Sequence, residues 1–139
     1  MIKVWSYLEE YQDEKKEIQG AISSVLESGQ LILGPNVASF EEEFSKWVGG
    51  KYSVGVANGT DAIFLALKAL DIKKGDQVIT VSNTAVPTVS AITAAGAEPV
   101  FVDIDPETYL MDVDKIESRI NKKTKAVIAV HLYGQAVDM

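Results

Sequence analysis

From residue 51 onward, short apolar runs alternate with segments of helical spacing, and this alternation constrains the fold more than any other feature of the sequence. The apolar runs are YSVGVA, QVITV, PVFVDI and KAVIAVHL, and the segments between them are TDAIFLALKAL, AVPTVSAITAAG and DVDKIESRI. Uninterrupted apolar strands indicate burial on both faces, as in a parallel sheet covered by helices. Alternation at this spacing predicts right-handed crossovers in a doubly wound arrangement. We therefore predict an α/β fold with a mostly parallel sheet flanked by helices.

The first 50 residues have the pattern of two amphipathic helices. Apolar residues recur at helical spacing from residue 7 to residue 27, and Ser28-Gly29 ends this pattern. A second apolar stripe follows at three- and four-residue steps and ends at Gly49-Gly50; it consists of Val37, Phe40, Phe44 and Trp47. We predict a helical segment over residues 1–50 and an α/β domain over residues 51–139.

Charge and composition argue against several classes of function. A formal net charge of −7 argues against binding to nucleic acid. The sequence has no cysteine and a single histidine, His131, so we expect neither thiol chemistry nor a metal site. The uncharged residues 77–97 include many polar side chains and Pro87, which argues against a membrane span. Because the first residues lack the apolar core of a signal peptide, we predict a soluble, cytoplasmic protein.

The sequence ends at HLYGQAVDM, directly after an apolar strand and its turn. No helical segment follows that would cover this strand, and an uncovered apolar strand is a liability for a folded domain. Either a partner covers the strand or the chain is a fragment of a longer protein. We favour the fragment.

Four short polar segments follow the predicted strands, where ligands bind in open α/β sheets. They are residues 58–60, 82–84, 103–105 and 131–135. In the first segment, the N–H groups of Gly59 and Thr60 and the Thr60 hydroxyl form a potential phosphate cradle at a helix start. Gly59 also allows close backbone approach and a positive φ. The alternative is a tight connection between packed elements, since the segment is neither a GxGxxG motif nor a Walker loop.

The other three segments have structural interpretations beside the functional ones. Pro87 suits the first turn of a helix, with Thr84 or Asn83 as a plausible cap. Asp103 and Asp105 should point to opposite sides of a strand end, which argues against an acid/base pair and favours a turn around DIDPET. A satisfied polar group at a strand end is the favoured interpretation of His131, with a general acid or a stacking partner as the alternative.

Several longer strings together resemble the DegT/DnrJ/EryC1/StrS aminotransferases. These strings are SGQLILGPNVASFEEEF, VANGTDAIFLAL, VSNTAVPTVSAITAAGAEPVFVDIDPETYLMD and TKAVIAVHLYGQAVDM. The resemblance implies a pyridoxal-phosphate (PLP) enzyme that transaminates a nucleotide-linked keto-sugar with an amino-acid donor such as glutamate. SNTAVPTV looks most like members that act on dTDP-linked 3-keto-6-deoxyhexoses. The resemblance also implies the large domain of the aspartate aminotransferase fold (fold type I) and a homodimer with shared active sites.

The resemblance assigns roles to individual residues. Gly59 and Thr60 match the pair whose amides, with the threonine hydroxyl, hold the cofactor phosphate. Ala85 stands where many members have an aromatic residue that stacks on the pyridine ring, which is a departure from the family pattern. Four further positions are candidates for the substrate site or the dimer interface: Leu31, Gly34, His131 and Gln135.

Two groups that the family uses have no counterpart in this sequence. The aspartate that pairs with the pyridine nitrogen and the lysine that forms the Schiff base would both lie beyond HLYGQAVDM. We therefore expect no catalytic residue in this chain and no transamination by the chain alone. Two alternatives remain: a non-catalytic remnant that binds phosphate or a nucleotide-sugar, and a related PLP-dependent sugar dehydratase in which histidine replaces the lysine.

Overall fold

The computed structural model describes residues 6–139, which divide into two compact units with the boundary between Gly55 and Val56. The domain boundary predicted between residues 50 and 51 stays a prediction. The first unit contains helices α1 (Tyr7–Ser28) and α2 (Pro35–Trp47). Helix α1 ends at Gly29, whose φ of 70° lets its N–H bond the Leu26 carbonyl. Both helices predicted for this part of the sequence are confirmed.

The two helices of the first unit leave their apolar faces exposed. No residue of α1 is buried, and Ser45 is the only buried residue of α2. Along α2, the Phe40 and Phe44 rings stack with centroids 5.7 Å apart, and Trp47 lies 5.8 Å from Phe44. These aromatic contacts lie within one helix, so they organise the apolar stripe without covering it. Trp47 remains 81% exposed.

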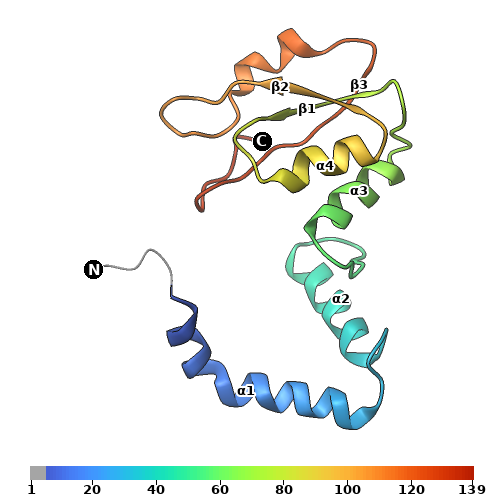
Figure 1. The fold of residues 1–139 in the computed structure, drawn as a ribbon, viewed down its shortest axis with the longest axis vertical. Coiled ribbons are helices and arrows are strands. Elements are labelled where there is room, and N and C mark those ends of the chain that lie inside the picture. The colour runs from blue at the N-terminus through green and yellow to red at the C-terminus, as the bar shows by residue number, and fades with distance from the viewer. Residues whose placement is uncertain (1–5) are drawn as a thin grey trace. The chain divides into compact units, whose positions relative to one another are not determined.

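The second unit is built on a three-stranded parallel sheet (Figure 1). Its elements are α3 (Gly59–Ala69), β1 (Gln77–Val81), α4 (Val86–Ala94), β2 (Glu98–Val102) and β3 (Thr124–Val127). The strand order is β2-β1-β3, and both pairs are parallel. Ile79 of β1 is in register with Val100 on one side and with Val127 on the other. The predicted parallel sheet is confirmed.

Apolar side chains pack on both faces of this sheet. On one face, Val78 packs with Leu67 and Ile92 from the side of α3 and α4. On the other face, Ile79 and Val81 pack with residues of the chain beyond β2, including Leu110, Met111 and Val137. Figure 1 shows α3 and α4 on one side of the strands and the short helical turns after β2 on the other. Burial on both faces explains why QVITV reads as an uninterrupted apolar run.

The strand predicted at YSVGVA is absent from the structure. Residues 52–56 have no regular secondary structure, and the side chains of Tyr52 and Val54 are 79% and 78% exposed. A strand exists only when its backbone groups pair with a neighbour, and no strand between residues 6 and 139 pairs with this segment. The strand predicted from residue composition is therefore wrong.

The helix predicted at DVDKIESRI is also wrong in type. The structure has two 3₁₀ turns there, Val113–Lys115 and Glu117–Arg119. Side chains compete for the backbone groups of this segment, since Asp112 accepts from the N–H of Asp114 and the Ser118 hydroxyl donates to the Lys115 carbonyl. The first three residues of the run KAVIAVHL belong to β3 (Thr124–Val127), and beyond the strand the Ile128 N–H still bonds the Ile79 carbonyl.

Among residues 6–139, no helix combines the length and the apolar character that a membrane span requires. Residues 77–97 contain strand β1, the connection that follows it and helix α4.

Candidate functional site

Helix α3 begins at Asn58, which is its N-cap. Asn58 is extended (φ −166°, ψ 174°), and its Oδ1 accepts a hydrogen bond of 2.9 Å from the Asp61 N–H. The Asn58 amide also donates to the Asp61 carboxylate at 3.1 Å, so the two side chains hold each other across the first turn. The Asn58 carbonyl accepts from Ala62 N–H, the first bond of the helix. The cap thus satisfies the Asp61 amide, one of the four that a helix start leaves without partners.

Two of the amides that remain without a partner at this helix start belong to Gly59 and Thr60. Within residues 6–139, neither N–H donates a hydrogen bond, and the Thr60 hydroxyl has no partner either. Gly59 is exposed, and a Cβ placed on it would meet no atom within 4 Å. The φ of Gly59 lies outside the left-handed region, so glycine is not needed for the backbone conformation. The absence of a side chain instead leaves the backbone N–H groups open to a ligand. Three free donors therefore lie together at the positive end of the α3 dipole.

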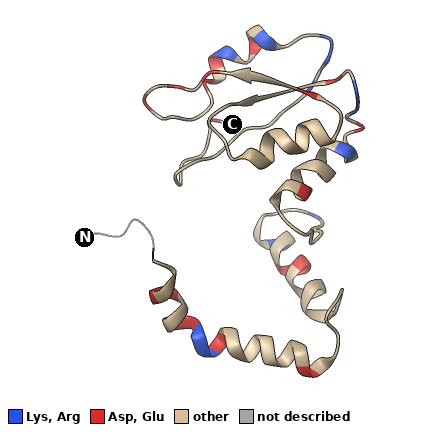
Figure 2. Ribbon diagram, in the orientation of Figure 1, with Lys and Arg blue, Asp and Glu red and all other residues tan. Residues whose placement is uncertain are grey.

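The charge around this helix start comes from the backbone and not from basic side chains. Residues 52–67 contain no lysine or arginine, and the nearest charged group of α3 is the Asp61 carboxylate. Asp61 lies in the first turn of α3 and Lys68 in its last turn, and Figure 2 shows the distribution of acidic and basic residues along the ribbon. An anion bound here would depend on the amides, the hydroxyl and the helix dipole. The cradle assigned to Gly59 and Thr60 stays a prediction, with geometry that fits it.

The connection from β1 to α4 is held by side chains on both sides. The hydroxyls of Thr84 and Thr88 are 2.7 Å apart, and the Asn83 amide donates to the Tyr109 carbonyl at 3.1 Å. The N-cap of α4 is Ala85, which provides no side-chain hydrogen bond, so the predicted cap at Thr84 or Asn83 is wrong. The reason is that the Thr84 hydroxyl bonds the side chain of Thr88 instead of a backbone N–H.

Two features of this connection agree with the sequence. Pro87 lies in the first helical turn, as predicted. Ala85, at the position of the family's stacking aromatic, is exposed and extended (φ −71°, ψ 146°). Its methyl group provides little surface for a ring, and a cofactor contact at this position stays a prediction.

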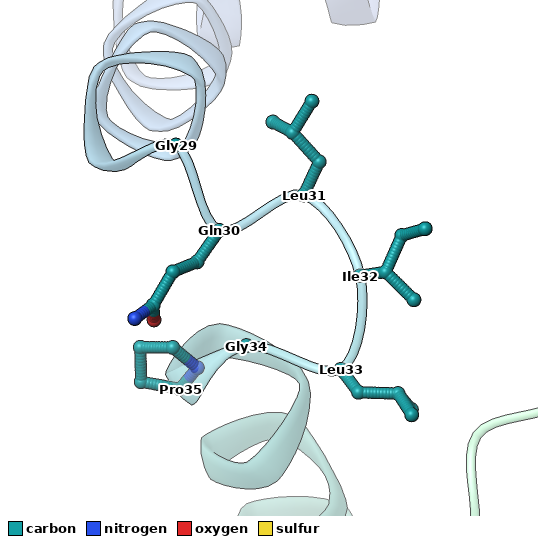
Figure 3. A pocket seen from close by; sticks show the side chains of 7 residues that line it. All are labelled: Gly29, Gln30, Leu31, Ile32, Leu33, Gly34 and Pro35. Atoms are coloured by element: carbon teal, nitrogen blue, oxygen red, sulfur yellow. The ribbon is translucent and has the colours of Figure 1, made fainter.

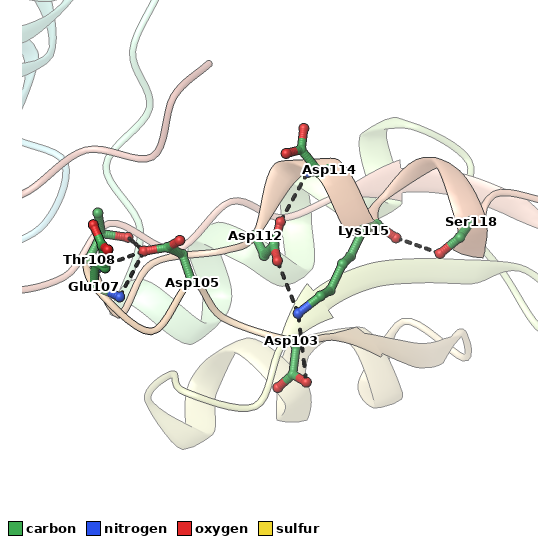
Figure 4. Close-up of polar contacts among 8 residues, drawn as sticks. All are labelled: Asp103, Asp105, Glu107, Thr108, Asp112, Asp114, Lys115 and Ser118. Atoms are coloured by element: carbon green, nitrogen blue, oxygen red, sulfur yellow. Dashed lines mark hydrogen bonds and ion pairs between the residues drawn. The ribbon is translucent and has the colours of Figure 1, made fainter.

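The aspartates after β2 are engaged in separate structural roles (Figure 4). The carboxylate of Asp105 accepts from the Thr108 N–H at 2.8 Å, the Glu107 N–H at 3.0 Å and the Thr108 hydroxyl at 3.0 Å. These bonds, above all those from Thr108, lower the pKa of Asp105 below its ordinary value. The turn predicted around DIDPET is confirmed.

Lys115 lies between two further carboxylates of this region, those of Asp103 and Asp112. Its ammonium is 3.0 Å from a carboxylate oxygen of Asp112 and 4.0 Å from one of Asp103. Figure 4 shows the Lys115 side chain between these two aspartates. The hydrogen bond to Asp112 raises the pKa of Lys115, and the charge of Asp103 adds to this effect. The contacts tie the end of β2 to the first 3₁₀ turn, which is a structural role. Nowhere in residues 6–139 do three or more potential metal ligands of the His, Cys, Asp and Glu types gather.

His131 and Gln135 belong to the turn that follows β3. The Nδ1 atom of His131 accepts a hydrogen bond of 3.0 Å from the Val137 N–H, so a neutral imidazole carries its proton on Nε2. The favoured interpretation of a satisfied polar group is confirmed. The Gln135 N–H bonds the Leu132 carbonyl at 2.8 Å across Tyr133 and Gly134, whose φ angles are both positive. A substrate role for His131 or Gln135 stays a prediction.

Leu31 and Gly34 lie in the first unit, in the loop between α1 and α2 (Figure 3). This loop lines a hollow of about 540 Å³, with Leu31, Ile32 and Leu33 all exposed. A Cβ on Gly34 would lie 3.0 Å from the Gln30 carbonyl oxygen, closer than most Cβ contacts, so the tight loop favours glycine there. The apolar, exposed loop has the character of a contact surface, and its assignment to an interface or a site entrance stays a prediction.

Sequence reasoning missed three interactions that shape these segments. The Asn58 cap had a visible signal, because Asn and Asp three residues apart in NGTD form a reciprocal pair at a helix start. Thr84 and Thr88 have the i,i+4 spacing at which side chains meet on a helix. This spacing was not a clear signal, because Thr84 precedes α4. The bond from Asn83 to the Tyr109 carbonyl spans 26 residues and had no local signal.

Comparisons with known proteins agree with the resemblance. The DegT/DnrJ/EryC1/StrS aminotransferase family matches residues 12–139. The dTDP-3-amino-3,4,6-trideoxy-alpha-D-glucose transaminase of Micromonospora megalomicea subsp. nigra is 52% identical over 136 residues, which are 98% of this chain and 36% of that protein. The dTDP-3-amino-3,6-dideoxy-alpha-D-galactopyranose transaminase of Aneurinibacillus thermoaerophilus is 52% identical over 125 residues, 90% of this chain and 34% of that protein. The chain thus spans about a third of the length of these relatives.

Solved structures show the same relationship at the level of the fold. A DegT DnrJ EryC1 StrS aminotransferase from Brucella abortus superposes with a TM-score of 0.92 at 34% identity, over 99% of this chain and 39% of that one. NtdA from Bacillus subtilis, solved with its cofactor PMP, superposes with a TM-score of 0.87 at 39% identity, over 91% of this chain and 29% of that one. The α/β fold with its parallel sheet is therefore the fold of these aminotransferases. This chain belongs to the DegT/DnrJ/EryC1/StrS aminotransferase family.

Proposed function

We propose that this chain is the N-terminal portion of a PLP-dependent aminotransferase that acts on a nucleotide-linked keto-sugar. The names of the two relatives at 52% identity, both transaminases of dTDP-linked 3-amino sugars, support a dTDP-3-keto-6-deoxyhexose as the substrate class. The amino group would come from an amino acid such as glutamate. The chain matches about a third of each relative, so this activity is proposed for the whole protein.

The observation that carries the proposal is the set of free donors at the start of α3. Gly59 and Thr60 present two unpartnered N–H groups and a hydroxyl beside open space, and residues 52–67 contain no basic side chain. These residues fit the phosphate of PLP, because a helix start binds phosphate through main-chain donors. When bound, PLP supplies the electron sink for transamination. The residues of this chain would hold the phosphate and thereby fix the position of the cofactor.

Other residues of the chain would contribute less directly. Ala85 would leave one face of the cofactor ring less covered than an aromatic residue does. We infer that the lysine and the aspartate of the family's chemistry come from outside these 139 residues, so the chain alone binds cofactor without transamination. A homodimer is supported by the apolar residues that the first unit exposes, including Leu31, Ile32 and Phe40.

The cradle can be tested by titrating the chain with PLP and, separately, with inorganic phosphate. Replacement Thr60→Val removes the hydroxyl donor and keeps the shape of the side chain. Loss of one hydrogen bond to a charged group costs about 1.5–3 kcal/mol, so both affinities should fall by at least about tenfold. The measurement is the ligand-dependent rise in Tm, which follows the dissociation constant.

A matched control uses another threonine at the surface of a helix. The hydroxyl of Thr93 bonds the Val89 carbonyl within α4, so Thr93→Val makes the same chemical change away from the cradle. This control should bind both ligands like the unmodified chain. Equal ligand-dependent shifts in Thr60→Val and in Thr93→Val would show that phosphate does not bind at the start of α3.

A further inference from the structure

We propose that the buried hydroxyl of Thr88 positions Thr84 as a hydrogen-bond donor toward a ligand at the carboxyl end of β1. Thr84 would contact an acceptor oxygen on the pyridoxal part of the cofactor, while Gly59 and Thr60 hold the phosphate. This inference rests on the proposed PLP site. It adds a residue, Thr88, that acts through its neighbour without touching the ligand.

The strand order places the β1–α4 connection at the mouth of the sheet. Strand β1 is the middle strand, with β2 on one side and β3 on the other. The chain thus leaves β1 toward β2 and later returns to the opposite side of β1. In open α/β sheets, the crevice that takes a ligand lies outside the carboxyl ends of the strands at such a switch of direction. Residues 82–85 are the segment directly beyond β1 at this point (Figure 1).

Burial decides the direction of the hydrogen bond between the two threonines. Thr88 is 6% exposed, and among residues 6–139 its hydroxyl bonds only the Thr84 hydroxyl, at 2.7 Å. If Thr84 donated, the Thr88 hydroxyl hydrogen would be buried with no acceptor, an arrangement that folded proteins avoid. Thr88 therefore donates and Thr84 accepts. The hydrogen of Thr84, which is only half-buried, is then left without a partner in the protein.

The backbone around Thr84 is fixed at the same time. The Thr84 N–H bonds the Ser82 carbonyl at 2.9 Å, and the Thr88 N–H bonds the Ala85 carbonyl at 3.1 Å. Asn83 anchors the other side of the segment through the Tyr109 carbonyl. The Thr84 hydroxyl oxygen already accepts a hydrogen bond, and the backbone around it is held in place. Thr84 therefore loses little conformational freedom when its hydroxyl donates to a ligand. Thr88 is accordingly a positioning residue for Thr84.

The test compares three variants of the chain, Thr88→Val, Thr88→Ser and Thr84→Val, with PLP and inorganic phosphate as separate probes. Thr88→Val and Thr84→Val should weaken PLP binding by about three- to tenfold, the effect of one net hydrogen bond. Thr88→Ser retains the hydroxyl and should restore PLP binding to near the unmodified level. Inorganic phosphate, which lacks the pyridoxal part, should bind all three variants equally. Thermal unfolding without ligand reports any general loss of structure.

Each other outcome has a defined meaning. Unchanged PLP binding in Thr88→Val overturns the inference, and so does an equal weakening of PLP and phosphate, which indicates a structural role alone. If the unmodified chain binds neither probe, the proposed cradle fails and the ligand contact of Thr84 fails with it. The positioning of Thr84 is then decided by hydrogen exchange of its amide, which Thr88→Val should accelerate and Thr88→Ser should not; equal exchange in both refutes it.

Discussion

Replacement of Asn58 by alanine tests how the start of α3 is built. Asn58→Ala removes the 2.9 Å bond to the Asp61 N–H and the 3.1 Å bond to the Asp61 carboxylate. Loss of an N-cap costs about 1 kcal/mol, within a range of roughly 0.5–2 kcal/mol. Because α3 buries Leu67 against the sheet, a less stable helix start lowers the free energy of unfolding of the whole second unit. For a domain of roughly 60–100 residues, about 1 kcal/mol lowers Tm by about 4–8 °C.

The assay is thermal unfolding followed by far-ultraviolet circular dichroism. The control is Asn58→Ser, because serine caps a helix about as well as asparagine and should keep Tm within about 2 °C of the unmodified chain. Equal Tm values for the alanine and serine variants would refute the reasoning. They would mean that the side chain of residue 58 does not hold the first turn of α3.

Three further predictions concern the core, the pH dependence and the turn after β2. Leu67 is 3% exposed and packs against the sheet, so Leu67→Ala should lower the free energy of unfolding by about 2–5 kcal/mol, measured by urea denaturation. Leu65 lies on the same helix but is 48% exposed, so Leu65→Ala should lower the free energy of unfolding much less. Similar decreases for the two variants would contradict the assigned core. The pKa of Asp105 is lowered from 3.8, so its carboxylate stabilises the fold above that value and ceases to do so as the pH falls through the lower folded-state pKa. Asp105→Asn should therefore be less stable than the unmodified chain at pH 7, and the difference should disappear in strong acid; a difference independent of pH would contradict this. Thr108→Val removes the hydroxyl bond to Asp105 and should raise the pKa of that carboxylate, measured by NMR titration; an unchanged pKa would show that the Thr108 hydroxyl bond does not hold it.

The parts of the fold that sequence predicted well are those whose pattern is local. QVITV is buried on both faces, so its apolar run was a direct signal of β1. Pro87 and the apolar spacing after it marked α4, and Gly29 marked the end of α1. In these segments the propensity of each residue and its place in the structure agree.

The errors occur where distant or side-chain partners decide the outcome. YSVGVA has the composition of a strand, but a strand needs a neighbour that composition does not supply. The helix predicted at DVDKIESRI gave way to 3₁₀ turns because Asp112 and Ser118 bond nearby backbone groups. In the candidate site, the free amides of Gly59 and Thr60 followed from local sequence, whereas the link from Asn83 to Tyr109 required the folded structure.

The most direct test of the proposed cradle follows individual backbone amides by NMR while PLP is added to the ¹⁵N-labelled chain. We predict that the signals of Gly59 and Thr60 move most among the amides of α3 and that the movement saturates, because these two N–H groups are free to receive the phosphate. If these two signals stay in place at millimolar PLP, whether or not signals elsewhere move, the phosphate does not bind at the start of α3 and the account is contradicted.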